Sequence, residues 1–284
     1  MDEIVNFNWT GKYFYMDMFP MMHTPYPILA IITVYLIFVL KIGRVYMKDR
    51  PPFDLEDLLK LYNIFQVCCC TYIVLAAHFI HGYSFFTFSQ CILSPNPVGV
   101  NDVSVSLPLV RFHIDGYLFM LLRLLELVET VFFVLRKKYN QVSILHVYHH
   151  ISTIALCWLF LKYRGGRMEM FIAVINSYVH IIMYAYYFFS SYKRFFKITN
   201  KIKPFITVIQ IVQLFLILVQ CIAITMCEKS NLNYAIVINF ILNIILFSHF
   251  FLKAYLLKPK RRVENNNNNN NNADEGKNRQ IISP

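Results

Sequence analysis

Seven segments of the chain are long and apolar enough to cross a lipid bilayer, and they constrain the fold more than any other feature. Roughly 20 apolar residues span the hydrocarbon core as a helix. Hydrophobic residues make up 57% of the 284 residues and charged residues only 15%, which is typical of a membrane protein. The predicted spans are Ile28–Tyr46, Leu58–Ile80, Gly116–Leu135, Ile144–Lys162, Met168–Ser190, Phe205–Cys227 and Asn233–Leu257. The predicted fold class is therefore an all-α integral membrane protein with seven transmembrane helices.

The basic residues are distributed unevenly between the two sides of these spans. Fifteen Lys and Arg residues fall on one side and six on the other. By the positive-inside rule the side with more Lys and Arg faces the cytosol. The net charge of +11 is therefore attributed to membrane topology and not to binding of nucleic acid. This predicts a lumenal N-terminal tail (1–27), a seven-helix domain (28–257) and a cytosolic tail (258–284). The basic loop between the fourth and fifth spans is the one exception, and the cytosolic tail, with eight consecutive Asn residues, is expected to be disordered.

The predicted lumenal side carries two sites for covalent modification. Asn8-Trp9-Thr10 is an N-glycosylation sequon in the predicted lumenal tail. Cys91 and Cys227 lie in or beside predicted lumenal loops, where an oxidising compartment allows a disulfide, and we predict one between them. The other five cysteines lie within spans and are expected to pack as small apolar side chains.

Three histidines, His146, His149 and His150, occupy the start of the fourth predicted span. Ionisable side chains inside a membrane are costly, so such a cluster indicates a functional site. Their spacing of i, i+3 and i+4 places the three rings on one face of a helix. A single hydrogen bond explains a lone buried histidine, but it explains three histidines on one face poorly.

Three other spans carry polar residues in the same half of the bilayer. They are Arg123, Glu126, Glu129 and Thr130 in the third span, Asn176, His180, Tyr184 and Tyr187 in the fifth, and Thr207, Gln210 and Gln213 in the sixth. Because none of these stripes can face lipid, they are expected to converge on one internal cavity near the cytosol. Each stripe also has a structural alternative. Glu126 can form an ion pair with Arg123, the glutamines can join helices, and Tyr187 can belong to an interfacial belt.

These residues resemble the motifs of the ELO fatty acid elongases. Arg123-Leu-Leu-Glu126-Leu-Val-Glu129-Thr130 is similar to their K-x-x-E-x-x-D-T motif, and His146-Val-Tyr-His149-His150 matches their H-x-x-H-H box. The segment from Asn176 to Tyr187 matches N-x-x-V-H-x-x-M-Y-x-Y-Y, and the segment from Thr207 to Gln213 matches T-x-x-Q-x-x-Q. The resemblance covers about Arg50 to Lys258. The departures, Arg for Lys at 123 and Glu for Asp at 129, keep the charge, although Arg and Lys are not equivalent.

The resemblance implies an enzyme of the endoplasmic reticulum membrane. Such an enzyme condenses a fatty acyl-CoA with malonyl-CoA, releases carbon dioxide and forms a 3-oxoacyl-CoA two carbons longer. The resemblance implies that the later six helices enclose an acyl-chain tunnel, that no cofactor or metal is needed, and that no nucleic acid is bound. It also implies that the product passes to the ketoacyl-CoA reductase, dehydratase and enoyl reductase of the elongation cycle, and it leaves a homodimer open.

For the chemistry we predict that His149 attacks the thioester to give an acyl-imidazole. His180 would orient the acyl carbonyl or the malonyl group, and His146 or His150 would transfer protons. The alternative is direct attack of a malonyl-derived enolate on the acyl-CoA. Cys157 is not favoured as the nucleophile, because it lies about 12 Å deeper than His149 along the helix. The candidate oxyanion donors are Asn176, Gln210 and Tyr184. The other candidate substrate-binding residues are Arg123, Glu126, Glu129, Tyr187 and Gln213.

Two other classes of membrane protein share some of these features. A membrane di-iron desaturase or hydroxylase needs several histidine boxes, and this chain has one box with its other histidines scattered. A seven-helix receptor is expected to bind its ligand from the outer side, whereas the polar residues here lie toward the cytosol. Neither class fits the sequence as well as an elongase.

Overall fold

The computed structural model describes residues 14–82, 107–163, 167–227 and 231–257, and within these ranges it contains helices and no strands. Asn8 and Cys91 lie outside the described residues, as does the side chain of Cys227, so the predicted glycosylation and disulfide stay predictions.

The elements are η1 (Phe14–Met18), α1 (Tyr26–Ile37), η2 (Phe38–Ile42), α2 (Gly43–Met47), α3 (Glu56–Leu75), η3 (Ala76–Ile80), α5 (Leu107–Leu125), α6 (Leu127–Leu135), η5 (Tyr139–Gln141), α7 (Ile144–Tyr163), α8 (Arg167–Ser190), η6 (Lys193–Phe195), α9 (Phe196–Cys227), α10 (Asn231–Phe251) and η7 (Leu252–Leu256).

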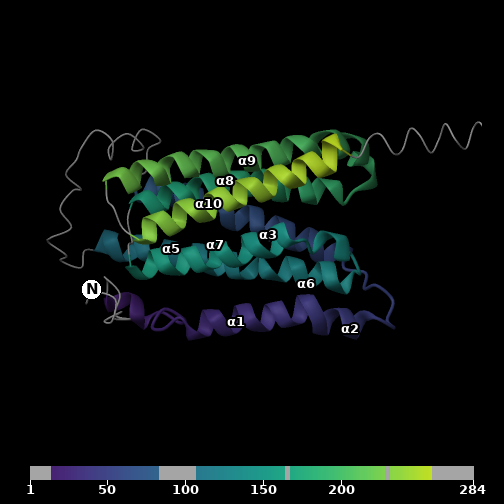
Figure 1. Cartoon of the computed structure of the whole chain (residues 1–284), viewed down its shortest axis with the longest axis horizontal. Helices are drawn as coiled ribbons and strands as arrows, with labels where there is room; N and C mark the ends of the chain where they lie inside the picture. Colours follow the sequence, from purple (N-terminus) through teal and green to yellow (C-terminus); the bar gives the residue numbers. More distant parts are fainter. Residues whose placement is uncertain (1–13, 83–106, 164–166, 228–230, 258–284) are drawn as a thin grey trace, which may run out of the picture.

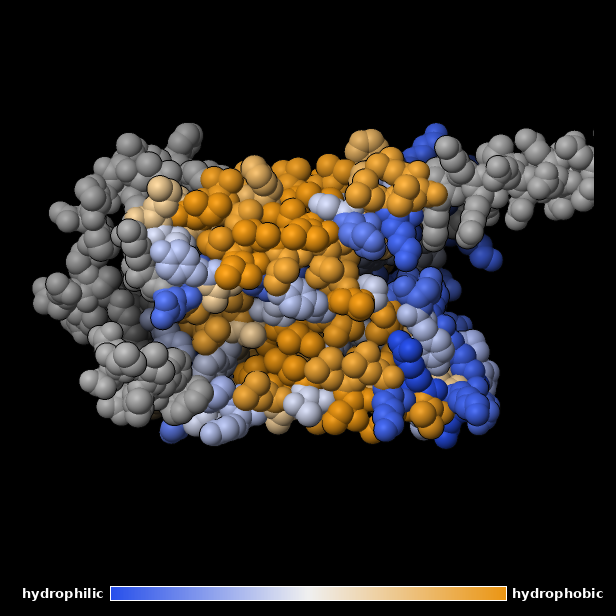
Figure 2. Space-filling view, viewed as in Figure 1, coloured by the Kyte–Doolittle hydropathy of each residue, from blue (hydrophilic) through white to orange (hydrophobic). Residues whose placement is uncertain are grey.

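Six of the described helices are long and apolar enough to cross a membrane. They are Tyr26–Met47, Glu56–Ile80, Ile144–Tyr163, Met170–Ser190, Lys197–Met226 and Asn231–Leu256, close to six of the predicted spans. A band of apolar side chains runs across the visible face between more polar ends (Figure 2). The predicted class of all-α membrane protein is confirmed. The predicted third span corresponds to α5 and α6, which are interrupted at Glu126 and carry several charges, so the count of seven stays a prediction.

The helices after α2 close into a ring. α5 packs against α7 and α3, α3 against α8, α8 against α9, α9 against α10, and α10 returns to α7 (Figure 1). The rod formed by α1 and α2 lies outside this ring and packs against α6, as the lower edge of Figure 1 shows. The ring therefore has an interior that is lined by helices.

Two glycines permit the closest helix approaches. A Cβ atom on Gly43 would lie 2.8 Å from a methyl carbon of Val134, where α2 packs on α6. A Cβ atom on Gly116 would lie 2.7 Å from a methyl carbon of Leu161, where α5 packs on α7. Small residues at such points are typical of helix packing in membranes, because they let the backbones come together.

An ion pair between a buried lysine and a half-buried aspartate ties the segment before α1 to the end of α7. The side chain of Lys162 is fully buried, forms an ion pair with Asp17, and also donates to the carbonyl oxygens of Met22 and His23. The indole of Trp158, one turn earlier on α7, donates to the carbonyl oxygen of Met21 at 2.9 Å. Lys162 is one of the basic residues that made the loop between the fourth and fifth spans an exception to the positive-inside rule. Its charge is therefore paired inside the protein with Asp17.

We expect Asp17→Ala to destabilise the protein by up to about 3 kcal/mol, because it leaves the fully buried ammonium of Lys162 without its carboxylate partner. Thermal unfolding of the detergent-purified variant measures the loss. The double variant Asp17→Ala/Lys162→Met removes both charges and should be clearly more stable than the single variant. Equal stability of the single variant and the wild type would show that this ion pair does not hold the segment.

Candidate active site

Arg123 is at the centre of a buried polar cluster between α5 and α8. Its side chain is 1% exposed. One terminal nitrogen, Nη2, lies 2.8 Å from Oε1 of Glu126, at the point where α5 ends. The other, Nη1, donates to Oδ1 of Asn176 at 2.7 Å and lies 2.9 Å from Nε2 of His180. The predicted structural ion pair is therefore present, and it also fixes two polar side chains of α8.

These contacts determine which nitrogen of His180 carries the proton. A guanidinium donates but cannot accept, so a neutral His180 accepts from Arg123 through Nε2, with Oε1 of Glu126 further away from the same nitrogen at 3.5 Å. The other nitrogen, Nδ1, then carries hydrogen and donates to the backbone oxygen of Asn176 at 2.9 Å. In this arrangement His180 is neutral and both of its ring nitrogens are engaged. It is therefore suited to holding Arg123 and Asn176 in place rather than to attacking a thioester.

The rings of the H-x-x-H-H box are neighbours, but they have different partners. His146 and His150 have ring centroids 4.4 Å apart, and those of His149 and His150 are 5.8 Å apart. His146 pairs through Nε2 with the hydroxyl of Thr130 on α6 at 2.8 Å. His150 places Nδ1 3.8 Å from Oε2 of Glu126. These two histidines thus face the α5–α6 junction.

His149 instead turns toward α10. Its Nδ1 lies 3.2 Å from Oδ1 of Asn243, and its ring packs edge-on against Phe247 with centroids 5.4 Å apart. Of the three histidines in the box, only His149 is among the residues that line the internal cavity. It is therefore the box histidine placed to meet a molecule in that cavity.

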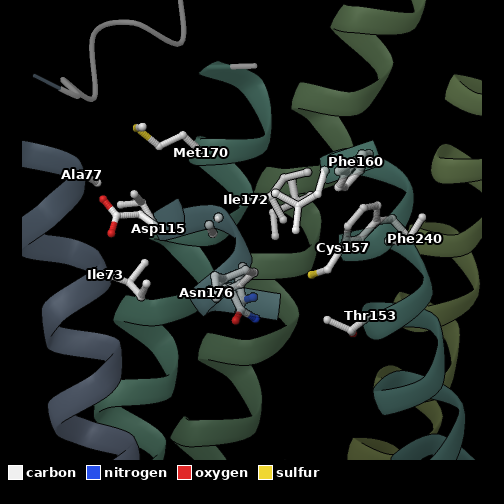
Figure 3. A pocket seen from close by; sticks show the side chains of 18 of the residues that line it. Ile73, Ala77, Asp115, Thr153, Cys157, Phe160, Met170, Ile172, Asn176 and Phe240 are labelled. Carbon is white, nitrogen blue, oxygen red and sulfur yellow. The ribbon is translucent and has the colours of Figure 1, made fainter. Parts of the chain in front are cut away.

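The cavity has a volume of about 110 Å³, lies within the ring of helices and is partly open to the outside. Its wall includes His149 and the amides of Asn176, Gln213, Asn239 and Asn243, and also the His81–Asp115 pair and Thr153. Most of the remaining wall is apolar. Figure 3 shows Cys157 and Phe160 of α7, Ile172 of α8 and Phe240 of α10 around it. The volume is below that of an engineered cavity that holds benzene, so a long acyl chain requires lining side chains to move aside.

Cys157 lines the same cavity as His149. The difference in depth along α7 therefore does not by itself separate the two as nucleophiles, since the cavity runs along the helix and reaches both. Cys157 is 9% exposed and lies among apolar side chains of the cavity wall.

The remaining predicted residues surround this cluster. Tyr184 is fully buried, its ring centroid is 5.7 Å from that of His180, and its hydroxyl lies near Glu126 and Tyr62. The ring of Tyr187 packs against that of Tyr184, and Glu129 is buried on α6. Gln213 lines the cavity, whereas Gln210 donates to the sulfur of Met183 at 3.2 Å. Of the predicted substrate-binding residues, Asn176 and Gln213 line the cavity and can meet a ligand there.

Several residues of the site are absent from the sequence prediction. Asn239 and Asn243 are spaced i and i+4 in an apolar helix, so the criterion that found the other polar stripes would also have found them. Tyr35 of α1 donates to Thr130 at 2.9 Å, and Thr130 in turn pairs with His146. Nothing in the sequence around Tyr35 indicates this contact, because it joins residues that are far apart in the chain.

Comparison with known proteins shows the family of the chain. Residues 20–263 match the sequence model of the GNS1/SUR4 family, ELO. The chain belongs to the ELO family. Curated relatives include very long chain fatty acid elongase F of Drosophila simulans, 36% identical over 206 residues that cover 71% of this chain and 75% of the relative. Elongase 1 of Mus musculus is 33% identical and is covered to 84% in both chains. Elongase 4 of Homo sapiens is 33% identical, and the aligned part is 74% of this ELO protein and 64% of the relative.

Proposed function

We propose that this ELO protein condenses a long-chain fatty acyl-CoA with malonyl-CoA. The products are a 3-oxoacyl-CoA two carbons longer, free CoA and carbon dioxide. The observation that carries the proposal is that His149, beside Asn243, lines a mostly apolar cavity inside a helical ring. An apolar cavity suits an acyl chain, and the polar groups in its wall suit the reacting thioester. The elongase names of the relatives support the same reaction.

The chemistry divides into two steps. In the first, Nε2 of His149 attacks the thioester carbon, the carbon–sulfur bond breaks, and the CoA thiolate leaves and takes up a proton. In the second, malonyl-CoA loses carbon dioxide, and the resulting enolate attacks the acyl-imidazole and frees His149. Direct attack of the enolate on the acyl-CoA gives the same products without the intermediate. The buried hydroxyl of Tyr184 and the amide of Asn176 are the candidate donors to the developing oxyanion.

The proposed location is the endoplasmic reticulum membrane, with the N terminus lumenal and the C terminus cytosolic. Basic residues at the proposed cytosolic end, including Arg50, Arg136 and Lys137, give that end a positive charge that attracts the anionic CoA. The reductases and dehydratase of the elongation cycle are the proposed next enzymes for the product, and a homodimer is a proposed assembly.

Purified protein supplied with labelled malonyl-CoA and a panel of acyl-CoAs tests the reaction. We expect labelled 3-oxoacyl-CoA two carbons longer than the acyl-CoA supplied, with one carbon dioxide released for each product. A well-folded preparation that forms no elongated product from any acyl-CoA in the panel would refute the proposal.

We further propose that no metal ion takes part. In the described ranges of the chain, no three His, Cys, Asp or Glu side chains are grouped so that they could hold a metal ion. Condensation should therefore proceed at an unchanged rate in excess chelator. Elemental analysis of the purified protein provides the control, and two iron atoms per chain together with loss of activity on chelation would contradict the proposal.

A further inference from the structure

His149 is held by two residues of α10 that belong to none of the elongase-like motifs. Asn243 is 2% exposed and lies 3.2 Å from the ring of His149, and Phe247, one turn further along, packs edge-on against the same ring. The spacing of four residues places Asn243 and Phe247 on the same face of the helix. The ring of His149 therefore contacts the Asn243 amide on one turn of α10 and the Phe247 ring on the next turn.

The orientation of the Asn243 amide follows from its other contacts. Its Nδ2 donates to the backbone oxygen of Asn239 at 2.9 Å and lies 3.4 Å from the side-chain oxygen of the same residue. That side-chain oxygen also accepts from the hydroxyl of Tyr148 at 2.8 Å. A backbone oxygen can only accept, so the NH₂ group of Asn243 must face Asn239, and its oxygen Oδ1 must face His149.

The proton position on His149 follows in turn. Because Oδ1 of Asn243 can only accept, Nδ1 of His149 must be the protonated nitrogen. The neutral ring then carries its lone pair on Nε2. We infer that Asn243 is a positioning residue that fixes His149 in the tautomer whose Nε2 can attack the acyl thioester. This inference rests on the proposed function and adds to it a residue on α10.

The same hydrogen bond serves the step that follows. When Nε2 forms a bond to the acyl carbon, positive charge develops on the ring, and a hydrogen bond from Nδ1 to Asn243 stabilises that charge. The contrast with His180 is informative. There, Nε2 is the acceptor of a hydrogen bond from Arg123 and its lone pair is already occupied. His149, which is half-buried, and His180, which is buried, are thus held for different tasks by different neighbours.

Proton positions on His149 can be observed directly. In protein labelled with ¹⁵N-histidine, the signals assigned by comparison with His149→Ala should show Nδ1 protonated and Nε2 unprotonated near neutral pH. Asn243→Ala should lose this preference. A wild-type ring protonated on Nε2 would overturn the inference, whatever reaction the enzyme catalyses, so this measurement is independent of the proposed function.

Kinetics of the first step provide the second measurement. In serine proteases the loss of the acceptor that fixes the histidine tautomer lowers kcat about 10⁴-fold, and for the neutral amide acceptor here we expect a loss of about 100-fold. The rate is read as CoA released from acyl-CoA in a single turnover. Asn243→Asp keeps an acceptor for Nδ1 and should recover much of this rate, with an altered pH profile because a carboxylate makes the imidazole more basic.

A matched control is available on the same helix. Ile245 is 56% exposed on α10, and Ile245→Ala should leave the rate unchanged. If the wild type forms elongated product but Asn243→Ala, folded as judged by its unfolding temperature, keeps its rate within threefold, Asn243 is not a positioning residue. If Asn243→Ala does not fold, Asn243→Asp provides the test. The inference is overturned if the rate and the pH profile of Asn243→Asp both equal those of the wild type. If the wild type forms no product, the proposed function fails instead.

Discussion

Replacing His149 with alanine is expected to reduce condensation by at least about 100-fold while the protein stays folded, in keeping with the cost of removing a catalytic side chain. His149 is the histidine of its box that lines the cavity, and its position next to Asn243 leaves Nε2 with a lone pair. The measurement is the initial rate of product formation from labelled malonyl-CoA at saturating acyl-CoA.

His249 provides the matched control for that change. It is an exposed histidine on α10, and His249→Ala should keep the wild-type rate. Both variants should elute from a sizing column as the wild type does and should unfold at a similar temperature. A His149→Ala enzyme that retains more than a few per cent of wild-type turnover would show that the assigned role is wrong.

Replacing Arg123 with methionine is expected to remove both activity and much of the stability. The change leaves the buried carboxylate of Glu126 without its partner and takes the donor away from Asn176 and His180. Breaking a buried pair in this way costs about 3 to 5 kcal/mol. Chemical or thermal unfolding of the purified variant measures the loss, and the condensation assay measures activity.

Two further variants separate charge from geometry at this position. Arg123→Lys keeps the charge and matches the residue in the elongase-like motif, so it should lose less stability than Arg123→Met. The double variant Arg123→Met/Glu126→Leu removes both charges and should recover stability without recovering activity, because the donor to Asn176 and His180 is still absent. If Arg123→Met is as stable as the wild type, the cluster around Arg123 does not hold α5 against α8.

The helices and their membrane character could be predicted from the sequence because the length and the apolar composition of a segment are enough to recognise a span. The predicted fourth span, Ile144–Lys162, and α7, Ile144–Tyr163, differ by one residue. The elongase resemblance was predicted from four motifs and is confirmed by the family match over residues 20–263. The interruption at Glu126 was not predicted, since the apolar pattern continues through it.

The site could be predicted only as a set of residues at one depth. Hydropathy and helical spacing place side chains along a span and around its axis, but they do not say which neighbouring helix each one meets. The pairing of Arg123 with both Asn176 and His180, and that of His149 with Asn243, therefore required the structure. The ion pair of Lys162 with Asp17 could not be predicted for the same reason, because Asp17 lies far away in the sequence.

Whether His149 takes up the acyl group is tested most directly by mixing the enzyme with acyl-CoA alone. An acyl-imidazole intermediate predicts a burst of about one equivalent of free CoA per active site, and a gain of one acyl mass that is lost when malonyl-CoA is added. His149→Ala should show neither effect, whereas Cys157→Ala should show both. Enzyme of proven activity that releases no CoA until malonyl-CoA arrives would contradict the acyl-histidine, as would a burst that survives in His149→Ala and disappears in Cys157→Ala.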